Sequence, residues 1–303
     1  SGRTTRGIRP YGSPDIQLDR AADYLPAVAA HHVVVDLDER REAVRGQVAA
    51  LAASVGGHIP DDPALLEEVT NLVEHPTAVL GHFEQEYLAL PPDVLVTVMK
   101  KHQRFFPVRD GAGDRDGDLM PYFVAVRNGD DQHLDVVRQG YEDVIRARFA
   151  DAKFFYEHDI RQPLDAFLPR LDTLTFQQDL GSMLDKGRRL EALAPAVARA
   201  LELGETAVAT TQRAAQIAKA DLATQLVVEF TSLQGLMGSH YSILSGEDRA
   251  VSTAILEHYL PRSAGDDLPD SGPGLALGLA DRLDSLVGLF AAGLAPTGSA
   301  DPY

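Results

Sequence analysis

The sequence contains no cysteine among its 303 residues. Disulfide bonds and thiolate metal sites are therefore excluded, which fits a reducing compartment. It also lacks any apolar run near the roughly 18 residues that a membrane-spanning helix needs. The first residues are polar and rich in glycine, so we expect no signal peptide. These absences favour a cytoplasmic protein without a membrane partner.

Several motifs of nucleotide sites and hydrolases are missing as well. No GxxxxGK[ST] phosphate loop occurs, and no GxGxxG follows a predicted strand. We find no recognisable pairing of a nucleophile with a general base. The sequence therefore predicts no catalytic residue, and its residues give no support for a hydrolase that uses such a pair.

The overall charge is strongly acidic, with a formal net charge of −17. This balance argues against a protein that coats nucleic acid non-specifically, and we expect no DNA partner. It remains compatible with a local basic surface that binds a folded RNA.

Basic side chains gather in one segment, from Val98 to Asp159, where aromatic residues are interleaved with them. Our candidates for RNA contacts in this segment are Lys100, Lys101, His102, Arg104, Arg127, Asn128, Arg146, Arg148 and Lys153. One interpretation is a site for an anionic partner. The other is that the cations form the solvated face of elements whose aromatic residues are core. We expect Phe105, Phe154 and Phe155 to be core rather than platforms for bases.

Individual candidates also leave two roles open. The cations at positions 100–104 follow a predicted helix, where they either contact phosphates or complement the helix dipole. Arg146 and Lys153 lie seven residues apart and share a helix face, whereas Arg148 points elsewhere. One of the two arginines is expected to reach RNA while the other pairs with Asp143, Asp151 or Glu142.

Periodicity predicts an α+β N-terminal domain followed by an all-α helical domain. Residues 1–30 read as extended or irregular, and a helix begins after an N-cap at Asp36 or Asp38. A second helix covers about residues 63–74, and strands are expected at 77–83 and 119–128. Helical patterns dominate after about residue 134, and we place the domain boundary at 170/171.

Six phrases occur in order along the chain: VMKKHQRFFPV, VIRARFADAKFFYEHD, LTFQQDLGSMLDK, KADLATQLVVEFTSLQGLMGSHY, EHYLPRSAGDDLP and LADRLDSLVGLFAAG. Together they resemble the β subunit of the bacterial heterotetrameric glycyl-tRNA synthetase, from about residue 5 to the end. The resemblance implies an internal part of that subunit. Residues 1–170 would be similar to a tRNA-synthetase module of the phenylalanyl enzyme's β subunit, and residues 171–303 to an HD-like helical domain, truncated at its C-terminus.

The resemblance also implies a function. The family's α subunit activates glycine with ATP and Mg²⁺, and the β subunit holds tRNA-Gly for charging. This chain would therefore be a non-catalytic tRNA-binding part of a glycine–tRNA ligase. Its partners would be tRNA-Gly and the α subunit, or an α-like catalytic domain, and it would bind no cofactor itself.

The HD-like part can be compared with a working HD phosphohydrolase, which needs an early His, a His-Asp pair and a later Asp. Here the pair reads Ala220-Asp221, and Asp281 matches the later Asp. Because the imidazoles are missing, we predict no metal site. We expect Asp221 and Asp281 to cap helices or to pair with Lys219, Arg213 or Arg282. The alternatives to tRNA binding are an HD-type metal-dependent phosphohydrolase and a structural scaffold between synthetase subunits.

Overall fold

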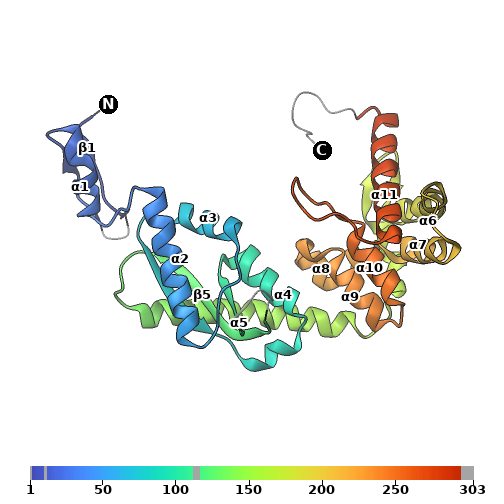
Figure 1. Ribbon diagram of the computed structural model, residues 1–303, viewed down its shortest axis with the longest axis horizontal. Coiled ribbons are helices and arrows are strands. Elements are labelled where there is room, and N and C mark those ends of the chain that lie inside the picture. Colours follow the sequence, from blue (N-terminus) through green and yellow to red (C-terminus); the bar gives the residue numbers. More distant parts are fainter. Residues whose placement is uncertain (1, 10–11, 112–116, 295–303) are drawn as a thin grey trace. The chain divides into compact units, whose positions relative to one another are not determined.

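The computed structural model describes residues 2–9, 12–111 and 117–294, and most of them are helical (Figure 1). The chain divides into two compact units, residues 1–153 and 154–303. The division falls inside the long helix α5 (Leu134–Asp159), so residues 154–170 belong with the second unit. The likeness of the two parts to a phenylalanyl-enzyme module and to an HD domain stays a prediction.

A three-stranded antiparallel sheet organises unit 1, with strand order β3-β5-β4. Strand β3 spans Pro76–His82, β4 spans Phe106–Arg109, and β5 spans Leu119–Asn128. The strands expected at 77–83 and 119–128 are therefore confirmed. Their apolar side chains alternate between two faces, so the sheet can be covered on both sides.

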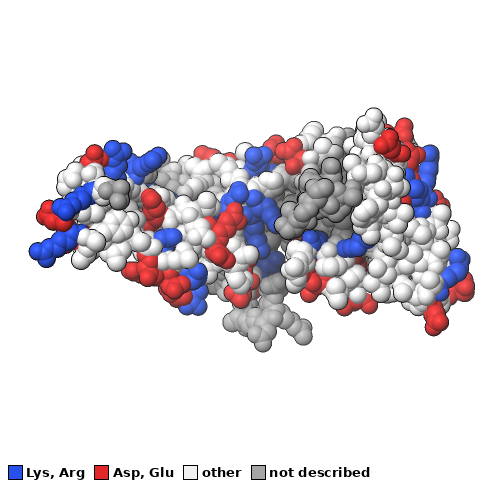
Figure 2. All heavy atoms as spheres, turned by 90° about the horizontal axis from the view of Figure 1, so that it is seen from above, with Lys and Arg blue, Asp and Glu red and all other residues white. Residues whose placement is uncertain are grey.

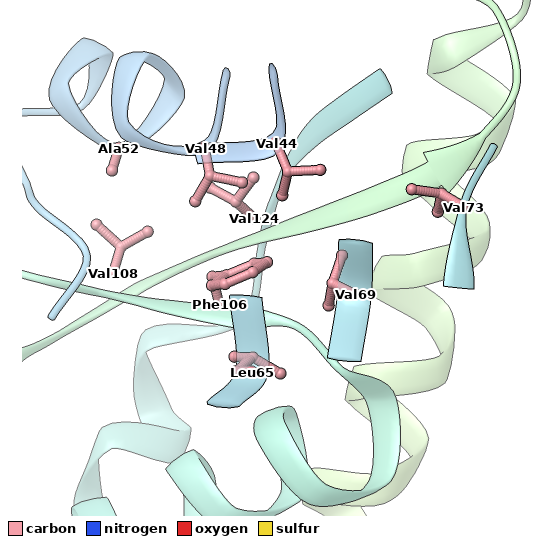
Figure 3. Close-up of a cluster of buried hydrophobic side chains, with 9 residues drawn as sticks. All are labelled: Val44, Val48, Ala52, Leu65, Val69, Val73, Phe106, Val108 and Val124. Atoms are coloured by element: carbon pink, nitrogen blue, oxygen red, sulfur yellow. The ribbon is translucent and has the colours of Figure 1, made fainter. Parts of the chain in front are cut away.

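One face of this sheet is covered by α2 (Leu37–Ser54) and α3 (Pro63–Leu72). Figure 3 shows side chains from both helices and from the strands pointing toward one another. This core consists of Val44, Val48, Ala52, Leu65, Val69, Val73, Phe106, Val108 and Val124. The predicted start of α2 is confirmed, because the Asp36 carboxylate accepts hydrogen bonds from the backbone N–H groups of Asp38 and Glu39, both at 2.9 Å.

The opposite face packs on α5. Phe123 of β5 stacks on Phe105 at 4.8 Å between ring centroids, and Tyr141 of α5 meets Phe105 edge-on at 5.2 Å. Gly81 of β3 lies so close to Phe123 that a Cβ atom there would come within 2.3 Å of the ring. Glycine at this position therefore lets the aromatic layer approach the sheet backbone.

The first thirty residues are more regular than predicted. Strands β1 (Thr4–Thr5) and β2 (Ile16–Gln17) pair, and a 3₁₀ turn at Ala21–Asp23 leads into the helix α1 (Tyr24–Ala29). The expectation of extended or irregular chain is therefore wrong for residues 21–29, which are helical, whereas β1 and β2 are extended. These elements are too short to leave a clear periodic signal in the sequence.

The chain between β3 and β4 is helical in three short pieces: a 3₁₀ turn η3 at Gln85–Ala89, the helix α4 at Pro92–Thr97, and the π-helical turn η4 at Val98–Gln103. Pro92 suits the first turn of α4 because it donates no backbone hydrogen bond there. The wider π turn follows without a break and carries the first group of basic candidates.

Unit 2 is a helical assembly, as predicted, with one small hairpin of β6 (Thr175–Gln177) and β7 (Gly181–Ser182). Among the residues that the structure describes, six α-helices lie wholly within unit 2: α6 (Met183–Ala200), α7 (Glu205–Ile217), α8 (Gln225–Glu229), α9 (Leu236–Leu244), α10 (Arg249–Glu257) and α11 (Gly272–Ala291). The 3₁₀ segment η5 (Leu164–Thr173) precedes the hairpin, η6 (Ala220–Ala223) follows α7, and η7 (Thr231–Leu233) lies between α8 and α9. Among the described residues, no helix is long and apolar enough to cross a membrane.

Candidate functional site

The first basic group lies on the turn between α4 and β4. Arg104 ends the π turn in a left-handed conformation, with φ of 56°, and the Phe105 N–H donates to the Met99 carbonyl at 2.9 Å. Because the π turn ends at Arg104, the strand Phe106–Arg109 begins directly after the basic residues. Lys101 is exposed, and it forms no hydrogen bond or ion pair with another residue in the described ranges. His102 is half-buried beside it.

Two neighbours of Lys101 already have acidic partners. Lys100 pairs with Asp62, the N-cap of α3, and Arg104 Nε donates to Glu68 Oε1 at 2.9 Å. Burial alone would raise the pKa of Asp62, but the hydrogen bonds from Lys100 and from the Leu65 N–H outweigh it and lower that pKa. Lys100 therefore stabilises the start of α3, and Lys101 is the cation of this turn that is most available to a ligand.

Arg127 and Asn128 hold the end of β5 in place. The Asn128 side-chain carbonyl accepts hydrogen bonds from the N–H groups of Glu74, at 2.9 Å, and His75, at 3.0 Å. Arg127 Nη1 donates to the Gln132 carbonyl at 2.8 Å. These contacts explain both side chains as parts of the loop structure, without any RNA.

On α5, Arg146 and Lys153 face the same short segment. Arg146 contacts Glu84 Oε1 at 2.5 Å and Asp143 Oδ1 at 2.7 Å, and Lys153 contacts Glu86 Oε2 at 2.8 Å. The hydrogen bond from Arg146 lowers the pKa of Glu84. The predicted common face of Arg146 and Lys153 is confirmed, and Arg146 is the arginine that pairs with Asp143. Arg148 is half-buried.

The candidates thus form separate groups with acidic neighbours. Figure 2 shows both basic and acidic side chains on one face of the molecule, where some of the blue side chains adjoin one another and white areas separate the groups. The expectation for the aromatic residues holds for Phe105, which is 6% exposed, and is wrong for Phe154, which is 64% exposed. Phe155 is half-buried. Phe154 stands near the end of an amphipathic helix, where sequence spacing alone does not show which face is covered.

A second group of charges lies inside unit 2, at the positions compared with an HD enzyme. Asp221 is fully buried, and its Oδ2 accepts hydrogen bonds from the N–H groups of Gly235, at 2.6 Å, and Gly238, at 3.1 Å. It therefore caps the start of α9, which confirms a structural role. Burial raises the pKa of Asp221 to about 6.

Asp281 of α11 lies between two buried lysines. Its Oδ2 accepts from Lys219 Nζ at 2.8 Å, and its Oδ1 is 2.9 Å from Lys186 Nζ. The pairing with Lys219 was predicted, whereas Arg213 pairs with Glu247 instead. Burial alone would raise the pKa of Asp281, but the two ammonium groups outweigh it and hold that pKa well below its usual range.

Arg282, the next residue on α11, was also a predicted partner of the aspartates, but it binds backbone. Its guanidinium donates to the carbonyls of His258, Tyr259, Leu260 and Pro261, at 3.1, 3.3, 2.8 and 3.0 Å. One side chain of α11 therefore forms four hydrogen bonds with the backbone of residues 258–261, which follow α10.

Sequence reasoning missed the role of His258. This fully buried imidazole lies 2.8 Å from Lys219 Nζ through Nε2, and 2.5 Å from the Ile255 carbonyl through Nδ1. Burial lowers the pKa of His258 to about 3, and the Lys219 charge adds to that lowering. The neutral ring therefore donates from Nδ1 and accepts at Nε2. The local signal was weak, because Lys219 and His258 are 39 residues apart in the sequence.

While Lys219 and Lys186 occupy the oxygens of Asp281, these donors do not fit a divalent metal ion. Both oxygens of Asp281 face ammonium groups, and Asp221 is used by α9. Within the ranges that the structure describes, no three His, Asp or Glu side chains are grouped so that they could hold a metal. A hollow of about 460 Å³ opens beside the group, lined by His258, Tyr259, Asp281, Arg282 and Ser285 with two leucines.

Comparison with known proteins identifies the family of this chain. The sequence profile of the family described as "Glycyl-tRNA synthetase beta subunit" matches residues 1–303. The chain belongs to the glycyl-tRNA synthetase beta subunit family. The resemblance drawn from the six sequence phrases is therefore confirmed.

Members of this family from several bacteria are similar over nearly the whole chain. The glycine–tRNA ligase beta subunit of Moorella thermoacetica is 48% identical over 287 residues, which are 95% of this chain and 41% of that protein. That of Synechocystis sp. is 48% identical over 301 residues, or 99% of this chain and 41% of the relative. That of Bacillus subtilis is 43% identical over 303 residues, or 100% and 44%. The chain thus spans less than half the length of these beta subunits.

Proposed function

We propose that this chain is a non-catalytic, tRNA-binding part of a glycyl-tRNA synthetase β subunit and works in the cytoplasm. It would position tRNA-Gly while a partner α subunit, or an α-like domain, joins glycine to the tRNA with ATP and Mg²⁺. The observation that carries the proposal is the family match along residues 1–303. Holding the terminal ribose near the activated glycine would lower the entropic cost of the transfer.

The turn Lys100–Arg104 is the part of unit 1 that we assign to RNA phosphates. Lys101 is exposed, and Arg104, whose side chain is 45% exposed, has the similarly exposed Glu68 as its ion-pair partner within the described ranges. An exposed pair of this kind is worth little, so a phosphate can replace the carboxylate at small cost. Lys100 is less suited, because it stabilises the N-terminus of α3.

The test is a titration of the chain with a tRNA-Gly transcript at two salt concentrations. We expect binding to weaken steeply as salt rises, because phosphate contacts release counterions. Lys101→Glu combined with Arg104→Glu should weaken binding at low salt by about tenfold or more. The matched control combines Arg199→Glu with Arg249→Glu, which changes the net charge equally at two other exposed positions.

If both double variants lose affinity equally, the binding is a general charge effect and the assignment to this turn is wrong. If neither loses affinity, the turn does not contact tRNA. A binding constant that is flat between the two salt concentrations would contradict any surface of phosphate contacts in this chain.

The second candidate function, a scaffold between synthetase subunits, is favoured by α11. Six apolar side chains of this helix are between 36% and 63% exposed: Leu275, Leu279, Leu283, Leu286, Val287 and Phe290. A continuous exposed apolar face usually contacts another protein surface. The tRNA titration separates the two functions, because a scaffold predicts no salt-dependent binding. The third candidate, a metal-dependent phosphohydrolase, finds no support in the donors around Asp221 and Asp281.

A further inference from the structure

The buried side chains around Lys219 surround its ammonium group in the way that protein ligands surround a bound metal cation. Lys219 Nζ lies 2.8 Å from the imidazole Nε2 of His258 and 2.8 Å from a carboxylate oxygen of Asp281. The aromatic ring of Tyr259 covers a further side, with its centroid 4.2 Å from Nζ. An imidazole nitrogen and a carboxylate are the groups that a metal ion ordinarily takes from a protein.

The orientation of His258 supports this comparison. Its Nδ1 is 2.5 Å from the Ile255 carbonyl, which can only accept a hydrogen bond, so Nδ1 carries the proton and Nε2 presents its lone pair to Lys219. Metal-binding histidines are fixed in the same way, by donation from the other ring nitrogen. Here the lone pair is directed at an ammonium group.

The other side of the site explains why a second lysine is present. Lys186 contacts Asp281 Oδ1 at 2.9 Å, Asp284 Oδ2 at 3.1 Å and Ser285 Oγ at 2.7 Å. It therefore neutralises the part of Asp281 that Lys219 does not reach, but no imidazole faces it in the described contacts. Lys219 is the cation that bridges nitrogen and oxygen ligands.

We propose that the Lys219 ammonium group takes the place of a metal ion between His258 and Asp281, so that unit 2 is held together by a covalently attached cation. An ammonium group is a compact point charge with three donors, and it can satisfy both acceptors. Because it is tied to the backbone, it stays in the site whatever the concentration of free metal. This inference concerns unit 2 alone and does not rest on the proposed tRNA binding.

The test removes the Lys219 ammonium group and supplies a free metal ion, cobalt(II), in its place. Lys219→Ala removes the ammonium group and opens its space, whereas Lys219→Met fills the same space without charge. Lys186→Ala is the matched control, since it removes the other buried ammonium group beside Asp281. Each full chain is melted with and without cobalt(II), and bound cobalt is measured by mass spectrometry and by visible absorption.

We expect cobalt(II) to raise the melting temperature of Lys219→Ala by about 5 °C or more, with one ion per chain and an absorption band of nitrogen and oxygen ligation. The unsubstituted chain, Lys219→Met and Lys186→Ala should not respond. Absence of a response in folded Lys219→Ala, or an equal response in Lys186→Ala, overturns the proposal.

Two further measurements do not depend on Lys219→Ala being folded. The unsubstituted chain should keep its melting temperature in excess chelator, and a fall there overturns the proposal. Lys219→Met combined with Asp281→Asn should melt at a higher temperature than Lys219→Met, because removal of the carboxylate charge relieves the loss of its cation. A double variant that is no more stable than the single one also overturns it.

Discussion

Two lysine–carboxylate pairs in this molecule have the same length and opposite surroundings. Lys153 of unit 1 lies 2.8 Å from Glu86, and Lys219 of unit 2 lies 2.8 Å from Asp281. The Lys153 side chain is 35% exposed and its partner 60%, whereas the values for Lys219 and Asp281 are 5% and 16%. Water screens the first pair, so the pair contributes little, while the second pair is largely shielded from water and separating its charges is costly. Distance alone therefore does not tell which cations are free to bind a ligand.

The largest effect that would sharpen this comparison is expected at Asp159. This carboxylate is 1% exposed, and it accepts hydrogen bonds from the N–H groups of Gln225 and Leu226, both at 2.9 Å, and from the Tyr241 hydroxyl at 3.2 Å. Asp159→Ala would leave three donors without their acceptor, two of them buried and the Gln225 N–H partly buried. We expect it to lower the free energy of unfolding by about 3 kcal/mol, measured by urea denaturation.

The control for this variant is Asp93→Ala, which removes an exposed carboxylate from the first turn of α4. Its expected cost is about 0.5 kcal/mol, from the helix dipole alone. Equal losses for the two variants would show that burial does not decide the value of a carboxylate in this chain.

The next effect is the pH dependence that His258 gives to unit 2. Burial and the neighbouring Lys219 charge lower its pKa from 6.5 to about 3, so the unfolded chain binds a proton between these values and the folded chain does not. Stability from this group is present above pH 6.5 and is lost as the pH falls toward 3. Asp281, Arg282 and Tyr259 also border the ring, so the contribution of His258 must be measured by difference.

We expect the melting temperature of the unsubstituted chain to fall more between pH 7 and pH 4 than that of His258→Gln. Glutamine retains an acceptor for Lys219 but cannot take up a proton in this range. Parallel pH profiles for the two proteins would contradict a neutral, buried His258.

The smallest effect is expected at the surface pair of unit 1. Lys153→Met should change the free energy of unfolding by less than about 1 kcal/mol, because the pair is exposed and each partner is solvated when alone. A double-mutant cycle with Glu86→Gln, in urea denaturation, should give a coupling of about 0.5 kcal/mol or less. A coupling of several kcal/mol would show that the exposed pair Lys153–Glu86 is as strong as a buried pair, which would contradict the comparison with Lys219–Asp281.

Local signals predicted local structure well. The Asp36 cap and the strands at 77–83 and 119–128 follow from residue types that act on their immediate neighbours. The role of the basic segment stayed open because the partners of its cations lie far away: Glu84 is 62 residues from Arg146, and Glu86 is 67 from Lys153.

The buried site was predictable only in part. The cap made by Asp221 and the pair of Asp281 with Lys219 follow from the rule that buried carboxylates need donors or cations. The lone pair of His258 and the second lysine, Lys186, depend on helix packing that brings α6, α10 and α11 together. The tRNA contacts and the HD-like identity of unit 2 stay predictions.

The fastening of α10 by Arg282 has a consequence for motion. One guanidinium from α11 satisfies four carbonyls in the stretch that follows α10, so fraying of the end of α10 would break hydrogen bonds to α11. The last turn of α10 should therefore exchange its amide hydrogens at the pace of α11, although a nine-residue helix alone would fray. We therefore expect the lifetime of this short helix to depend on a side chain that lies more than twenty residues further along the sequence.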